Sequence, residues 1–186
     1  MQLTPAQKLF VSKILKSDDD VVHVTRHEAG HRLMWSILYP DRKTRYAVVD
    51  GLPQVRMFDE TQNKKRKIAD MEKEDIAKLT AIKLAGYAAE MLLMSLDDDN
   101  SIAEIADFIA TDYQADAPMI DWREDAQYGG DIPDACELIG RTVGWRNLAI
   151  TLARFLKAAI VDLQDSGGEL EKEQQEALKI IKGDML

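Results

Sequence analysis

The sequence predicts a mainly α domain with a small two-stranded β element. Apolar residues recur every three or four positions through most of the chain, which is the helical period. Only one stretch instead shows two short β-like runs separated by turn residues. With 186 residues, 46% of them hydrophobic, the chain has the size and composition of one domain. We therefore expect a single domain over residues 1–186, with a core at about 18–164 and a C-terminal helix at about 169–186.

Two helices are expected before the β element. Thr4 suits the cap of a helix that runs to about Lys16, and Pro5 suits its first position. The second helix is expected over Val21–Leu38. Three aspartates at residues 18–20 precede it, where acidic groups cap free N–H groups and suit the positive end of the helix dipole.

The β element follows directly. Arg45–Asp50 and Gln54–Phe58 read as two strands, and the Asp50–Pro53 turn between them predicts a hairpin. Residues 61–70 are polar and are expected to form a loop.

The C-terminal half reads as helical again. The period predicts three long helical segments, over Glu72–Met94, Ser101–Tyr113 and Ile132–Leu163. Residues 115–130 between the second and the third are turn-rich and acidic. Gly140 and Gly144 are expected to bend the third segment or to tighten it against a neighbour. Gly167-Gly168 then separates a last, polar helix.

Charge and cysteine usage limit the class of protein. The net charge of −9 argues against nucleic acid or an anionic membrane as the main partner, and a solvated loop explains the basic run at residues 64–67. The sequence shows no long apolar segment and no signal-peptide pattern, so we expect a soluble, cytoplasmic protein. Cys136 is the only cysteine, which excludes an intrachain disulfide, and its apolar helical surroundings argue against a nucleophilic role.

The three histidines of the chain lie together. His27 and His31 are the ends of an HExxH motif. Residues four apart on a helix share a face, with Cβ atoms about 5–6 Å apart, so both imidazoles can bind one Zn²⁺ at about 2.0–2.1 Å. Glu28 lies beside them and is expected to act as general base on a zinc-activated water.

The simpler alternative is a helix that carries two histidines on its surface. The expected helix is half apolar, and burying two imidazoles there is costly unless a partner satisfies their nitrogens, which favours zinc. His23 lies eight residues before His31, about 12 Å along a helix. His23 therefore cannot bind the same ion as His27 and His31. We expect it to contact the ligands from behind or to pack in the core.

Three segments resemble the peptidase domain of FtsH-type ATP-dependent zinc proteases. They are the HEAGH motif in Arg26–His31, the Ala-Gly-x-Ala-Ala-Glu pattern in Ile82–Glu90, and the helix start at Gly130–Ala135. The resemblance covers roughly Val21–Ala159. It implies a helical zinc-peptidase domain with the β element beside the HExxH helix, and it implies that Asp131 is the third zinc ligand.

The sequence also departs from that family. It has no Walker A motif, no AAA+ module and no transmembrane anchor, so this chain is not expected to unfold proteins with ATP. Residues 95–127 form an insertion that we expect to cover the cleft or to alter an oligomer contact. Tyr87 replaces the arginine usual in the family, which bears on oligomer contacts and, we expect, not on the zinc site.

Without the resemblance, the residues themselves do not decide which side chain is the third zinc ligand. Asp131 stands at a helix start, where a plain N-cap also has an aspartate. Glu90 is the rival ligand, or else a buried acceptor that orients the histidines. Gly86 is expected to allow close helix packing, and Trp122 and Tyr128 are candidates to line a cleft.

The expected function is that of a stand-alone zinc metalloendopeptidase acting on peptides or flexible protein segments. Zn²⁺ would be held by His27, His31 and Asp131, with an extended substrate beside the strands near Val48 and Val55. The sequence leaves open a separate ATPase as a partner, and it leaves open an oligomer. The alternative is a non-catalytic adaptor or interaction protein that keeps the zinc fold.

Overall fold

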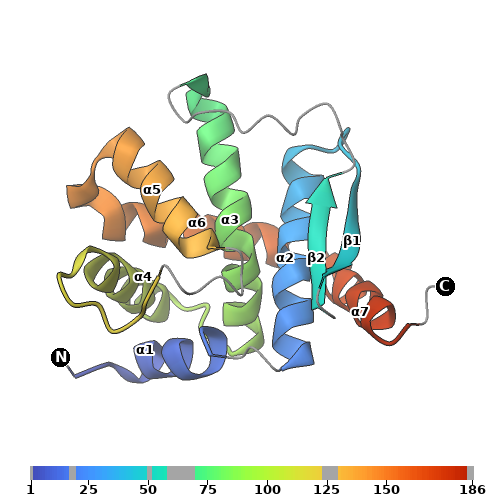
Figure 1. Ribbon diagram of the computed structural model, residues 1–186, viewed down its shortest axis with the longest axis horizontal. Coiled ribbons are helices and arrows are strands. Elements are labelled where there is room, and N and C mark those ends of the chain that lie inside the picture. Colours follow the sequence, from blue (N-terminus) through green and yellow to red (C-terminus); the bar gives the residue numbers. More distant parts are fainter. Residues whose placement is uncertain (1, 17–19, 50–51, 58–69, 123–129, 184–186) are drawn as a thin grey trace.

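The computed structural model describes residues 2–16, 20–49, 52–57, 70–122 and 130–183. This part of the chain is mainly helical with one antiparallel strand pair, which confirms the predicted class (Figure 1). In chain order the elements are α1 Pro5–Leu9, the π-helical turn η1 Phe10–Ile14, α2 Val21–Leu38, β1 Thr44–Val49, β2 Leu52–Met57, α3 Lys73–Leu93, α4 Asp99–Gln114, α5 Asp131–Val143, the 3₁₀ turn η4 Trp145–Asn147, α6 Leu148–Gln164 and α7 Glu169–Ile181.

Helices α2 and α3 lie side by side at the centre of the molecule (Figure 1). The hairpin and α7 pack against α2, whereas α5 and α6 pack against α3 and α4 packs on α6. Residues from α1 through α7 contribute to one hydrophobic core. None of the described helices combines the length and the apolar character that crossing a lipid bilayer requires.

The first two helices begin as predicted. Thr4 and Gln7 form a capping box, in which the Gln7 amide donates to Thr4 Oγ1 at 3.3 Å and the Thr4 amide donates to Gln7 Oε1 at 3.0 Å. Asp20 caps α2 by accepting a hydrogen bond from the Val22 amide at 2.9 Å. The two preceding aspartates lie outside the described residues.

The hairpin has the predicted topology. Its strands are antiparallel, and the register places Val49 opposite Leu52. The turn residues 50–51 lie outside the described part of the chain, as does the segment 58–69 that holds most of the loop predicted at 61–70. The described strands therefore confirm the hairpin and position it against α2 and α7.

The long helix predicted over 132–163 is wrong, because the structure divides it into α5 and α6. Gly144 ends α5 with a φ of +89°, a backbone conformation that other residues adopt only with strain. The short turn η4 follows, and α6 begins at Leu148 and packs back on α5. The glycine reverses the chain rather than bending one continuous helix.

The described part of the insertion at 95–127 contributes to the core. Its helix α4 starts two residues earlier than predicted, because the Asp98 side chain accepts from the Asn100 and Ser101 amides at 3.1 and 3.0 Å. Ile105 and Phe108 on α4 are fully buried. This helix packs on α6 and α1, so it is an integral layer of the fold.

Helix α7 fixes α2 through charged side chains on either side of the histidine motif. Arg26 donates to the Ala89 carbonyl of α3 at 3.2 Å and pairs with Glu171 of α7 at 3.1 Å. Arg32 pairs with Glu173 of α7 at 2.9 Å. The polar C-terminal helix thus holds the motif-bearing helix against the rest of the core.

Two glycines allow α2 and α3 to approach closely. A Cβ atom added at Gly30 would lie 2.4 Å from the Ala85 carbonyl oxygen and 2.8 Å from the Ala89 Cβ atom. A Cβ added at Gly86 would lie 2.6 Å from the His27 ring. These distances are shorter than van der Waals contact, which confirms the close packing expected at Gly86.

We predict that Gly30→Ala destabilises the protein by about 1–3 kcal/mol, because the backbone of α3 cannot yield as a flexible side chain can. The measurement is the free energy of unfolding from urea denaturation. Ser36→Ala, on the exposed face of the same helix, is the control and should change it by no more than about 0.5 kcal/mol. Equal midpoints for Gly30→Ala and the parent would contradict the close approach of α2 and α3.

Candidate metal centre

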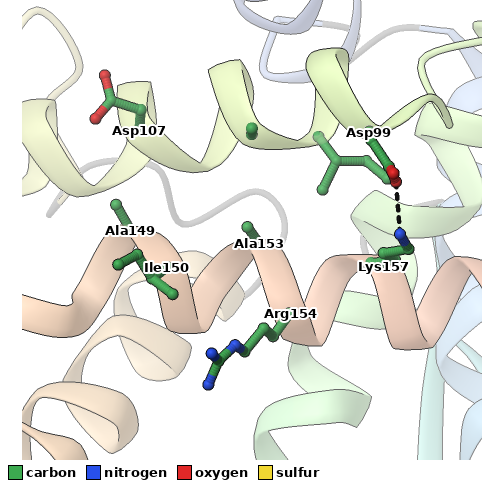
Figure 2. A pocket seen from close by; sticks show the side chains of 9 residues that line it. Asp99, Asp107, Ala149, Ile150, Ala153, Arg154 and Lys157 are labelled. Carbon is green, nitrogen blue, oxygen red and sulfur yellow. Dashed lines mark ion pairs between the residues drawn. The ribbon is translucent and has the colours of Figure 1, made fainter.

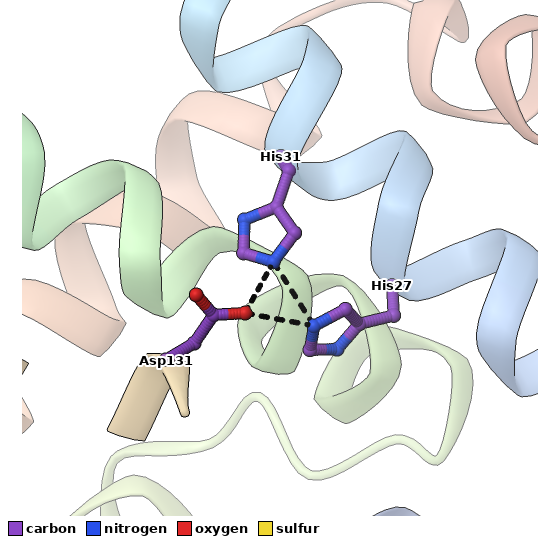
Figure 3. Close-up of side chains that lie close together, drawn as sticks. All are labelled: His27, His31 and Asp131. Atoms are coloured by element: carbon purple, nitrogen blue, oxygen red, sulfur yellow. Dashed lines mark hydrogen bonds and ion pairs between the residues drawn. The ribbon is translucent and has the colours of Figure 1, made fainter. Parts of the chain in front are cut away.

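Three side chains expected to bind metal come together between α2 and α5. His27 and His31 project from one face of α2, and Asp131, the first residue of α5, faces them (Figure 3). The Nε2 atoms of the two histidines are 2.9 Å apart, and Asp131 Oδ2 lies 3.0 Å from His31 Nε2 and 3.5 Å from His27 Nε2. All three side chains are buried. The three ligand atoms thus surround one point.

The Nδ1 atom of each ring, on the side away from the cluster, is hydrogen-bonded to α3. His31 Nδ1 donates to the Ile82 carbonyl at 2.7 Å, and His27 Nδ1 donates to Glu90 Oε1 at 2.8 Å. A neutral imidazole carries one hydrogen, and here that hydrogen is required at Nδ1. When both rings are neutral, each Nε2 atom therefore directs a lone pair toward the other and toward Asp131, as in metal sites whose histidines are oriented from behind.

This arrangement requires a positive charge. Two lone pairs 2.9 Å apart, next to a carboxylate oxygen, repel one another unless a proton or a metal cation lies between them. Burial alone would lower the pKa of His27, but hydrogen bonds to Asp131 and Glu90 outweigh it and raise that pKa to about 10. For Asp131, burial would raise the pKa, yet the nearby His31, His27 and Lys83 hold it well below its usual value.

The donor set fits a zinc ion. Ligand atoms bound at about 2.0–2.1 Å to a tetrahedral zinc lie about 3.3 Å from each other. The three distances of 2.9, 3.0 and 3.5 Å lie around that value. Two imidazole nitrogens and one carboxylate oxygen are ordinary zinc ligands, and three protein ligands are the number found in catalytic sites with one open position.

Asp131 does not act as a helix cap. The cap position of α5 belongs to Gly130, and among the described residues no side-chain hydrogen bond caps this helix end. Instead, Asp131 Oδ2 faces the histidines while Oδ1 accepts from Lys83 Nζ at 2.9 Å. The geometry thus disfavours the plain N-cap alternative and favours the role of third ligand.

Glu90 lies behind the site. It is completely buried, and its two oxygens accept from His27 Nδ1 at 2.8 Å and from His23 Nδ1 at 2.9 Å. The hydrogen bond to Glu90 is also the main reason why the pKa of His23 is raised. Glu90 is therefore placed to orient His27 from the side away from the ligand atoms, and His23 in turn holds Glu90.

Glu28 adjoins the ligands on α2. Its side chain is half-buried, and its negative charge is among the influences that raise the pKa of His27. A carboxylate at this place is close enough to the cluster to act on His27 and is still partly exposed.

Sequence reasoning missed two neighbours of the cluster on α3. Lys83 binds Asp131, and the buried Tyr87 ring meets the His27 ring edge-on at 4.8 Å between centroids. Tyr87 was expected to bear on oligomer contacts, and close α2–α3 packing instead brings its ring against His27; whether it affects the zinc chemistry stays a prediction. A spacing of four and then three residues puts Lys83, Tyr87 and Glu90 on one face of the helix. This spacing was the sequence signal that could have identified both neighbours.

Two other expectations concern residues away from the cluster. Trp122 is buried and packs near Tyr113, with ring centroids 6.4 Å apart, whereas Tyr128 lies outside the described residues.

Cys136 is fully buried, and burial raises the pKa of its thiol to about 12. A thiol of that kind is a poor nucleophile, in agreement with the sequence.

Away from the cluster, a concave region lies between α4 and α6 and has a volume of about 420 Å³ (Figure 2). Ala149 and Ala153 contribute to its apolar floor, and an ion pair of 2.7 Å joins Asp99 and Lys157 at one end. Its lining contains no histidine and no cysteine. The cluster between α2 and α5 is therefore the stronger candidate for chemistry.

The sequence matches no protein-family model, and neither the curated proteins nor the solved structures include a significant match. The site thus defines the chain only as a mainly helical protein with a buried His-His-Asp group that could hold a metal ion.

We predict that Asp131→Ala weakens zinc binding by more than the 10–100-fold typical of a residue behind the ligands, whereas Glu90→Gln stays within that range. The reason is that Asp131 faces both Nε2 atoms and Glu90 faces only Nδ1 atoms. Zinc dissociation constants from competition with a chromophoric chelator provide the measurement. Glu137→Ala, which removes a carboxylate from the surface of α5, is the control.

The reverse order of effects would make Glu90 the third ligand. If Glu90→Gln abolished zinc binding and Asp131→Ala only lowered the thermal stability, the arrangement around Oδ2 of Asp131 would be incidental.

Proposed function

We propose that this protein is a zinc metallopeptidase that hydrolyses peptide bonds in peptides or flexible protein segments. The observation that carries the proposal is the convergence of His27 Nε2, His31 Nε2 and Asp131 Oδ2, with both Nδ1 atoms already bonded to α3. The HExxH spacing adds Glu28 next to these atoms. This combination supports metal-assisted hydrolysis better than a purely structural site.

Each protein residue has a distinct role in the proposed reaction. Zinc, when bound by the three ligands, would supply Lewis-acid activation of water and of the substrate carbonyl. Glu28 accepts a proton from the attacking water and returns it to the leaving nitrogen. Glu90 and the Ile82 carbonyl keep the two imidazoles in the tautomer that directs Nε2 toward the reaction.

The hairpin is the proposed substrate platform. It packs on α2, the helix that carries the histidines, and a two-stranded sheet has an outer backbone edge on each strand. An extended peptide can add to such an edge through main-chain hydrogen bonds. Val48 of β1 is half exposed, so its surroundings are accessible to a partner. We therefore place an extended substrate near Val48 and Val55.

The alternative function is that of a non-catalytic zinc protein that serves as an adaptor. A structural zinc site is closed by four protein ligands. Among the described residues the candidate group has three ligands, His27, His31 and Asp131. Glu28 is not one of them, so a purely structural site would leave its carboxylate without a role. Both points favour the catalytic proposal.

We predict that Glu28→Gln retains zinc and the fold but lowers kcat for a fluorogenic peptide by about 10²–10⁴-fold, because only proton transfer is lost. Casein serves as a second, unfolded substrate, and a chelator should abolish hydrolysis by the parent. Glu137→Gln on the surface of α5 is the matched control and should keep the parent rate.

Cleavage by Glu28→Gln at the parent rate would exclude it as general base. If the zinc-loaded parent cleaved nothing and X-ray absorption showed four protein ligands, the adaptor alternative would replace the peptidase proposal.

A further inference from the structure

Lys83 joins the helix that supports the histidines to the helix that carries the aspartate. It lies on α3, and its Nζ atom is 2.9 Å from Asp131 Oδ1 and 2.9 Å from Asp134 Oδ2. Both carboxylates belong to the first turn of α5. These two ion pairs connect α3 to α5.

The place of the ammonium group decides which oxygen of Asp131 faces the histidines. A carboxylate has two equivalent oxygens and can bind an ion through one or both. Here Oδ1 is engaged by Lys83, and Oδ2 lies 3.0 Å from His31 Nε2. A carboxylate that bound through both oxygens would use a second position on the ion.

The backbone before Asp131 offers no comparable restraint. Gly130 has a φ of +73°, and a Cβ added there would meet nothing within 4 Å. Because glycine is conformationally permissive, the chain entering α5 does not by itself fix the direction of the Asp131 side chain. The direction of the Asp131 side chain is instead restrained by Lys83 on α3, together with the packing of α5 on α3.

Electrostatics alone does not explain a lysine here. A cation beside a metal site repels the metal and competes for its carboxylate ligand. A purely electrostatic effect of Lys83 would therefore weaken metal binding, whereas a restraint on Asp131 would strengthen it. The two effects have opposite signs, and this makes the role of Lys83 measurable.

We infer that Lys83 is a positioning residue that holds Asp131 as a one-oxygen ligand and docks the first turn of α5 onto α3. The inference rests on the metal centre of the proposed function and deepens it. By occupying Oδ1, Lys83 leaves one coordination position of the ion for water or substrate, and it disfavours ions that take carboxylates through both oxygens.

The test compares Lys83→Met, Lys83→Arg and, as the matched control, Lys78→Met. Lys78 is on the same helix, but it pairs with Glu74 one turn away on that helix, at 2.6 Å. We expect Lys83→Met to bind zinc 10–100-fold more weakly, Lys83→Arg to restore most of the affinity, and Lys78→Met to match the parent. X-ray absorption of the zinc-loaded Lys83→Met protein should show an additional oxygen ligand.

A double-mutant cycle separates positioning from a general loss of structure. In an Asp131→Ala background, Lys83→Met should no longer weaken zinc binding, because its positioning effect passes through Asp131 and only the repulsion between Lys83 and the ion is left to lose. Equal effects in both backgrounds would overturn the inference, as would unchanged or tighter zinc binding by Lys83→Met alone. If Lys83→Met does not fold, Lys83→Gln replaces it in the same cycle, with the same expected sign.

These measurements need no substrate, so they are independent of peptidase activity. A parent that binds zinc and cleaves nothing contradicts the proposed function while the Lys83 comparison still decides the inference. A parent that binds no zinc overturns both.

Discussion

The close contact between α2 and α3 is the constraint on which the candidate site depends. With only hydrogen atoms at Gly30 and Gly86, the two helices approach until the His27 ring lies against the α3 backbone at Gly86. At that distance the Ile82 carbonyl and the Glu90 carboxylate reach the Nδ1 atoms of the two histidines. Helix packing therefore sets the tautomers, and the tautomers direct both Nε2 atoms to one point.

The same packing brings Glu90 and Arg26 into the core, where both have compensating partners. Glu90 is completely buried and accepts from two histidines, and Arg26 contacts a carbonyl of α3 as well as Glu171 of α7. A buried charge without such partners would cost several kcal/mol. Because every connection joins different helices, the network also restricts how these helices can move relative to one another. A rigid His27 and His31 are what a preorganised metal site requires.

Local sequence signals predicted the helices and the histidine pair, but long-range packing determined the rest. The bounds Val21–Leu38 follow from the aspartate cap and the apolar period, and both are properties of neighbouring residues. The contact between Asp131 and the histidines joins positions 100 or more residues apart, and a resemblance rather than the spacing suggested it. Lys83 and Tyr87 share a face with Glu90, yet the period alone does not tell which face meets α2. The division at Gly144 was missed because the helical period continues on both sides of the glycine.

The two halves of the site are held by different kinds of force. The histidines are on one helix, and their geometry follows from the close packing of α2 on α3 and from buried hydrogen bonds, which salt screens little. The aspartate comes from α5, and its direction relies in part on two ion pairs of the quarter-exposed Lys83 side chain. Ion pairs at such a depth are more readily altered by solvent and by neighbouring charge than a packed core is. Completion of the site by Asp131 is thus the step that is most sensitive to the surroundings, whereas the histidine pair is in place wherever the protein is folded.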